Sequence, residues 1–71
     1  MLLRYYIDDV PYLDKVRKAY YKDGVAYFIG DGITISAHMN VSEWSMLAND
    51  MFADNKLILP KDKYKVWRVV E

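Results

Sequence analysis

Apolar and polar residues alternate through much of the first half of the chain, and this pattern predicts an antiparallel meander of three strands. Asp23-Gly24 separates "AYYK" from "VAYFI", and this dipeptide is typical of a two-residue hairpin turn. Gly30-Asp31-Gly32 separates "VAYFI" from "ITISA" and marks a second turn. We therefore expect strands at about residues 16–22, 25–29 and 33–38.

The length of the second turn decides which side chains face the core. A two-residue loop would pair Phe28 with Ile35 and Ile29 with Thr34, which mixes residues of the apolar face with residues of the opposite face. A buried face penalises such mixing, so the pattern favours a three-residue loop with Gly32 in the left-handed conformation. The predicted core face then carries Val16, Tyr20, Val25, Tyr27, Ile29, Ile33, Ile35 and Ala37. The opposite face carries Arg17, Ala19, Tyr21, Ala26, Phe28, Thr34, Ser36 and His38.

A helix is predicted over residues 41–53. Asn40 is a favourable N-cap, and Glu43 follows it at the spacing of a capping box. Asn55 is suited to a left-handed cap at the other end. Between the caps, apolar residues recur with helical spacing, at Val41, Trp44, Leu47, Ala48 and Met51. A helix with one apolar stripe is expected to cover one face of a sheet.

Strands are also predicted near both ends of the chain. "LLRYYI" is one, and "KLILP" and "YKVWRVV" read as two more around a hairpin turn at residues 60–63. Residues 8–15 are compatible with a loop or with a short helix that starts at Pro11. The prediction is one α+β domain over residues 1–71, with an antiparallel sheet of about five or six strands and one helix on one face.

Composition restricts the classes of protein to which the chain can belong. The chain has no cysteine and one histidine, which excludes disulfides and argues against a structural zinc site. Its formal net charge is zero, so it lacks the basic excess of a typical nucleic-acid or membrane-surface protein. No apolar run reaches the ~18 residues that a membrane helix needs. We expect a cytoplasmic protein without a membrane partner.

Tyr6-Ile7-Asp8-Asp9 matches the Y-x-D-D pattern of reverse transcriptases. In those enzymes the adjacent aspartates hold divalent ions together with a third carboxylate from far upstream. Only five residues precede Tyr6 here, so the aspartates are expected to form a turn at the end of the first strand. His38, the single histidine, has no signature of a nucleophile or acid around it. No catalytic residue, metal site or cofactor is predicted, and the chain is not expected to be an enzyme.

Two surfaces are candidates for binding. The preferred hypothesis is a small protein-binding module, of the inhibitor or modulator type that phages and mobile elements carry, with Arg17, Tyr21 and Phe28 as its exposed contacts. The alternative is a nucleic-acid-binding protein that uses the basic and aromatic stretch 15–22, through Lys15, Lys18, Tyr20 and Lys22. A self-assembling structural subunit is the second alternative. Small size, zero net charge and abundant aromatic residues also favour a homodimer.

Overall fold

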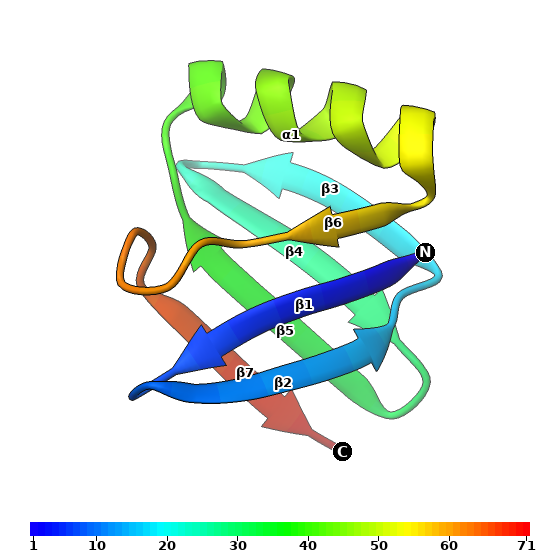
Figure 1. Ribbon diagram of the computed structural model, residues 1–71, viewed down its shortest axis with the longest axis vertical. Coiled ribbons are helices and arrows are strands. Elements are labelled where there is room, and N and C mark those ends of the chain that lie inside the picture. Colours follow the sequence, from blue (N-terminus) through cyan, green and yellow to red (C-terminus); the bar gives the residue numbers. More distant parts are fainter.

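The computed structural model of the chain has seven strands in two sheets and one helix (Figure 1). It describes residues 1–71 apart from the side chain of Phe52. One sheet, in the order β2-β1-β6, contains β1 (Leu2–Ile7), β2 (Val10–Lys15) and β6 (Lys56–Ile58). The other, in the order β3-β4-β5-β7, contains β3 (Lys18–Lys22), β4 (Val25–Gly30), β5 (Ile33–His38) and β7 (Val66–Val70). The helix, α1 (Val41–Asp54), follows β5.

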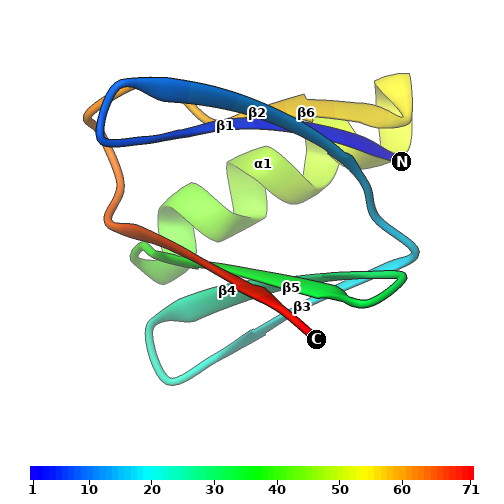
Figure 2. The ribbon, with the colours of Figure 1, turned by 90° about the horizontal axis from the view of Figure 1, so that it is seen from below.

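The two sheets lie in separate layers, and α1 runs along one open side between them (Figure 2). The α+β class is confirmed, whereas the expectation of a single sheet is wrong. The reason lies at the corner between β2 and β3. The backbone N–H of Val16 donates to the Met1 carbonyl in one layer, and the N–H of Arg17 donates to the Ile29 carbonyl in the other. Two consecutive residues therefore hydrogen-bond to different sheets, and the chain bends from one layer into the next.

The core lies between the layers and receives side chains from both. From the three-stranded sheet and its continuation it contains Leu3, Tyr5, Leu57 and Leu59. From the other sheet and the connecting segments it contains Val16, Ala26, Phe28, Ile33, Ile35, Ala37 and Met39. Trp44, Leu47 and Met51 of α1 pack against the edge of this cluster. The helix thus seals the side of the sandwich instead of covering a sheet face.

The turn between β4 and β5 contradicts the expected loop length. Gly30 pairs with Ile33, so the loop has two residues, Asp31 and Gly32, and Gly32 has the expected positive φ of 68°. Phe28 consequently faces the core beside Ile35. The prediction failed because it assumed that all the larger apolar side chains must be buried together.

The predicted core face is therefore right for one part of the chain and wrong for another. Val16, Ile33, Ile35 and Ala37 are buried as expected. The residues assigned to the core from β3 and β4 point outward instead, namely Tyr20, Val25, Tyr27 and Ile29. Tyrosine rings tolerate this position because their hydroxyl groups remain in water.

Residues 8–15 are neither a loop nor a helix. Asp8 and Asp9 have positive φ angles of 50° and 66° and form a two-residue turn, after which β2 pairs antiparallel with β1. Pro11 is accommodated because β2 is an edge strand. The Asp23-Gly24 hairpin is confirmed, since Lys22 pairs with Val25.

The last two strands do not form the predicted hairpin. β6 pairs parallel with β1, and β7 pairs antiparallel with β5 in the other sheet. The turn residues 60–63 thus belong to a crossing between layers. Local turn chemistry alone could not distinguish this crossing from a hairpin.

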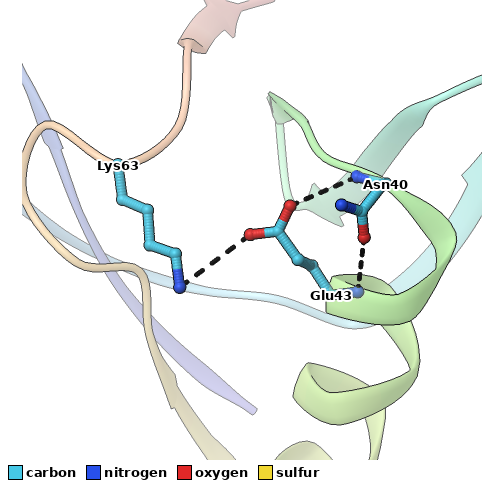
Figure 3. Close-up of polar contacts among 3 residues, drawn as sticks. All are labelled: Asn40, Glu43 and Lys63. Atoms are coloured by element: carbon cyan, nitrogen blue, oxygen red, sulfur yellow. Dashed lines mark hydrogen bonds and ion pairs between the residues drawn. The ribbon is translucent and has the colours of Figure 1, made fainter.

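The helix and its caps agree with the prediction. The Glu43 N–H donates to Asn40 Oδ1 at 2.9 Å, and the Asn40 N–H donates to Glu43 Oε1 at 3.5 Å (Figure 3). Asn55 closes the helix with a φ of 52°. Lys63 Nζ lies 3.8 Å from Glu43 Oε2, which ties the β6–β7 crossing to the start of α1. Among the described residues, no helix is long and apolar enough to cross a membrane.

Candidate functional site

The outward side of the four-stranded sheet is the surface most unlike an ordinary solvated face, and we term it the outer face. Because side chains alternate along each strand, its members follow from the observed pairing register. They are Lys18, Tyr20, Lys22, Val25, Tyr27, Ile29, Thr34, Ser36, His38, Lys65, Trp67, Val69 and Glu71. Lys65 and Glu71 lie just outside β7 but belong to the set because both continue the β5–β7 ladder. The Lys65 carbonyl accepts from the His38 N–H, and the Glu71 N–H donates to the Gly32 carbonyl.

An aromatic row crosses the middle of this face. Tyr20 pairs with Tyr27, Tyr27 with Ser36 and Ser36 with Trp67, so these residues form one line across four strands. Tyr20 and Trp67 retain 40% and 42% of their accessible surface. Ser36, with its small side chain, leaves room above β5 between the rings of Tyr27 and Trp67.

The rings of the row are held by cross-strand neighbours. Tyr20 and Tyr27 stack with ring centroids 4.9 Å apart. The His38 ring lies 4.6 Å from the Trp67 ring at a tilt of 60°. Cross-strand aromatic pairs of this kind stabilise a sheet and also restrict ring rotation. The row therefore offers a planar ligand rings that are already ordered.

Lysines stand beside the aromatic rings. Lys18 Nζ lies 5.7 Å from the centre of the Tyr20 ring, and Lys65 Nζ lies 5.2 Å from the centre of the Trp67 ring. Lys22 is exposed at the end of β3. An ammonium group at this distance from a ring can contact an anionic group attached to whatever stacks on that ring.

The outer face carries one carboxylate, Glu71, against the three lysines Lys18, Lys22 and Lys65. The nearest other carboxylates along the chain, Asp23 and Asp31, lie in turns. Asp31 is also paired, at 3.1 Å, with Arg17. The formal net charge of zero thus conceals a separation of charge, and this face has a local positive excess.

The predicted protein-binding residues are not brought together on an exposed surface. Phe28 is fully buried in the core. Tyr21 is half-buried under α1, where its hydroxyl donates to the Met39 carbonyl at 2.9 Å and its ring stacks on Trp44. Arg17 is exposed at the corner between the sheets. Their assignment to one exposed face is wrong, because it followed from the incorrect loop length at residues 30–32.

Three of the four residues predicted for nucleic-acid contact lie on the outer face. Lys18, Tyr20 and Lys22 share the outer face. Lys15 does not, because it ends β2 and pairs with Leu2 in the other layer. Tyr27, Lys65, Trp67 and His38 are the members that sequence reasoning missed. A two-residue loop at Asp31-Gly32 would have placed Tyr27 beside Tyr20, whereas no local signal predicted that Trp67 pairs with Ser36.

A second polar cluster connects the two layers at the side away from α1. The Tyr5 hydroxyl donates to Asp14 Oδ2 at 2.6 Å and accepts from Arg68 Nε at 2.9 Å. The Arg68 guanidinium lies 5.0 Å from the centre of the Tyr12 ring. Burial raises the pKa of the Tyr5 phenol well above its usual value, and the adjacent Asp14 carboxylate raises it further. The polar groups of this cluster pair with one another, so it joins the two sheets. We term Tyr5, Tyr12, Asp14 and Arg68 the clasp.

The Asp8-Asp9 pair of the Y-x-D-D pattern lies in an exposed turn. Asp9 Oδ1 lies 3.3 Å from Lys61 Nζ, so the carboxylate forms an ion pair with this lysine. Within the described part of the chain, no three or more histidine or acidic side chains gather as a metal site would require.

Comparison with known proteins adds no relative from which a role could be transferred. No protein family, curated protein or solved structure matches the chain.

Proposed function

We propose that the protein is a non-enzymatic binding module that holds single-stranded nucleic acid on the outer face. The observation that carries this proposal is the aromatic row Tyr20, Tyr27 and Trp67 with lysines beside it, on a face whose lysines outnumber its one carboxylate. Proteins that bind single strands combine aromatic stacking platforms with basic groups that follow the phosphates. A four-stranded sheet with exposed aromatic residues is one established form of this arrangement.

The geometry supports a simple binding mode. Bases stack on the exposed surfaces of Tyr20 and Trp67, which lie three strands apart and thus roughly 14 Å from each other at ~4.8 Å per strand. The strand passes over Ser36 between them. Lys18 and Lys65 then turn from the rings toward the phosphates. Stacking is tolerant of sequence, so we expect little base specificity.

Fluorescence anisotropy with labelled single-stranded dT12 and rU12 tests this proposal. Tyr20→Ala or Trp67→Ala should weaken binding by about 5-fold to 100-fold, since each stacked base contributes ~1–3 kcal/mol. Tyr6→Ala, on the outward side of the other layer, is the matched control and should change affinity little. Duplex DNA should bind much more weakly than either single strand.

The salt dependence supplies a second readout. Lys18→Gln and Lys65→Gln should each reduce the slope of log K against log [salt] by about 0.7. Lys15→Gln makes the same change in net charge on the other layer and should leave the slope unchanged. The proposal fails if neither oligonucleotide binds below millimolar concentration, or if the Lys15 and Lys18 substitutions act equally.

A protein partner is the second candidate function. Exposed Tyr20, Trp67 and Val69, the last with 57% of its surface accessible, are residues that a protein interface can bury on the same face. An inhibitor or modulator would then use the outer face in place of the Arg17, Tyr21 and Phe28 cluster. This candidate gains support if Trp67→Ala abolishes capture of a host protein while binding stays insensitive to salt and to competing oligonucleotide.

A further inference from the structure

The free edge of β7 presents unpaired backbone groups. The N–H of Glu71 donates to the Gly32 carbonyl, and the N–H of His38 donates to the Lys65 carbonyl, so residues 65 and 71 face β5. In an antiparallel ladder, hydrogen-bonding residues alternate along each strand. The N–H and C=O groups of Val66, Arg68 and Val70 therefore point away from β5. In the described part of the chain, no strand lies beyond β7 to receive them.

The other edge strands carry features that discourage pairing with another chain, and β7 does not. β2 contains Pro11, β3 carries Lys18 and Lys22, and β6 has only three residues. Lysine, proline and short length are the usual protections of sheet edges. β7 reads Val66-Trp67-Arg68-Val69-Val70, with 57% and 62% of Val69 and Val70 exposed. Its one charged side chain, Arg68, is already engaged by Tyr5 and Asp14.

We propose that β7 pairs antiparallel with β7 of a second copy, in the register that places Arg68 opposite its own counterpart. This register uses all three edge-facing residues, because Val66 then meets Val70 of the partner copy. On the outer face it places Trp67 beside the partner copy's Val69. It also places Lys65 opposite the partner copy's Glu71, twice in each dimer, so the ends of the two strands are complementary in charge.

The chain's own charge and contacts favour this occupant. Because the formal net charge is zero, two copies approach without overall repulsion. The two Arg68 side chains that meet at the symmetry axis are each compensated by Asp14 of their own chain, at 3.7 Å. The two sheets then form one eight-stranded sheet whose outer faces are continuous. The pairing stands independently of the ligand proposed for that face, and it doubles the face's width.

Sedimentation velocity over micromolar to near-millimolar concentrations measures the dimer directly. Lys65→Glu places two like-charged pairs at the interface and should raise the dimer dissociation constant about tenfold. The double substitution Lys65→Glu with Glu71→Lys restores opposite charges and should return it close to the wild-type value. Lys61→Glu, which makes the same charge change in the β6–β7 crossing, is the control and should have little effect.

A second pair of variants tests the edge itself. Val70→Pro removes an edge-facing N–H while the β5 ladder is kept, and it should abolish the dimer. Ile58→Lys alters the opposite sheet's edge strand and should not. Circular dichroism melts establish that each variant is folded. A wild-type chain that stays monomeric at the highest concentration overturns the proposal, as does a dimer that the double charge reversal fails to restore.

An oligonucleotide titration of the same variants separates the two proposals. If the wild type is dimeric and the monomeric Val70→Pro variant still binds dT12, the β7 pairing exists and is not needed for binding. If the wild type is dimeric and binds no oligonucleotide, the proposed function fails while the pairing of β7 stands.

Discussion

Gly30, at the end of β4, lies against the backbone of Lys15, at the end of β2 in the other layer. A Cβ built at Gly30 would lie 2.9 Å from Ile33 Cγ2 and closer still to the Lys15 carbonyl oxygen. A backbone atom cannot move aside as the end of a flexible side chain can. Gly30 therefore gives the backbone room at the corner where β2 bends into β3. The sequence pattern had placed it in the hairpin loop instead.

Gly30→Ala should consequently destabilise the protein by roughly 2–3 kcal/mol, as overpacking of a tight site does. Gly24→Ala is the comparison: its Cβ would meet nothing within 4 Å, but its φ of 81° is unfavourable for alanine. That change should cost only about 1 kcal/mol. Urea unfolding midpoints measure both, and a larger loss for Gly24→Ala would contradict this account of the corner.

At the scale of elements, α1 is the part of the fold that local sequence determined best. Its N-cap, capping box and left-handed C-cap depend only on residues within one turn, such as Asn40 and Glu43. The three strands of the meander were also located correctly for this reason. Their facing was correct only after the turn, because a single residue more or less at Asp31-Gly32 exchanges the inward and outward sides of the positions before it relative to those after it.

Asn40→Ala should lower the free energy of unfolding by about 1 kcal/mol through loss of the helix cap. Asn49, exposed within the helix, provides the control: Asn49→Ala should be neutral or slightly stabilising, since alanine has the higher helix propensity. Thermal melts followed by circular dichroism at 222 nm compare the two. An equal effect at both positions would show that the hydrogen bonds in Figure 3 contribute nothing to stability.

At the scale of the whole molecule, long-range pairing made the arrangement unpredictable from sequence. Nothing near Trp67 indicates that it pairs with Ser36, and nothing near Leu57 indicates that it pairs with Leu3. The candidate site is affected in the same way, because its aromatic row combines rings from three strands. Local sequence patterns identified Lys18, Tyr20 and Lys22 as site residues because these three share one strand. They did not identify Trp67, which lies on a strand distant in sequence.

The clasp between layers gives the whole molecule a measurable response to alkaline pH. The pKa of Tyr5 is raised in the folded state, so the folded protein retains a proton that the unfolded chain loses near pH 10. The resulting stabilisation is complete below pH 10 and is lost progressively as the pH rises above it. Tyr5→Phe should therefore flatten the decrease in unfolding free energy above about pH 10.

Part of the alkaline decrease should survive in Tyr5→Phe, because burial also raises the pKa of Tyr64. The double substitution of Tyr5 and Tyr64 by phenylalanine should flatten the profile further. Guanidinium unfolding at a series of pH values provides the measurement. A Tyr5→Phe profile that runs parallel to that of the wild type would show that the clasp is open in solution.

The parallel pairing of β1 with β6 also dictates an order of events in time. The hairpins β1–β2, β3–β4 and β4–β5 close over short stretches of chain, whereas β6 reaches β1 only after everything between them exists. On the ribosome, a chain that has emerged through β5 has its meander but lacks β6, β7 and α1. The apolar side chains of Phe28 and Ile35 are then open to other molecules, and the nascent protein is at its most vulnerable to aggregation just before α1, β6 and β7 are made.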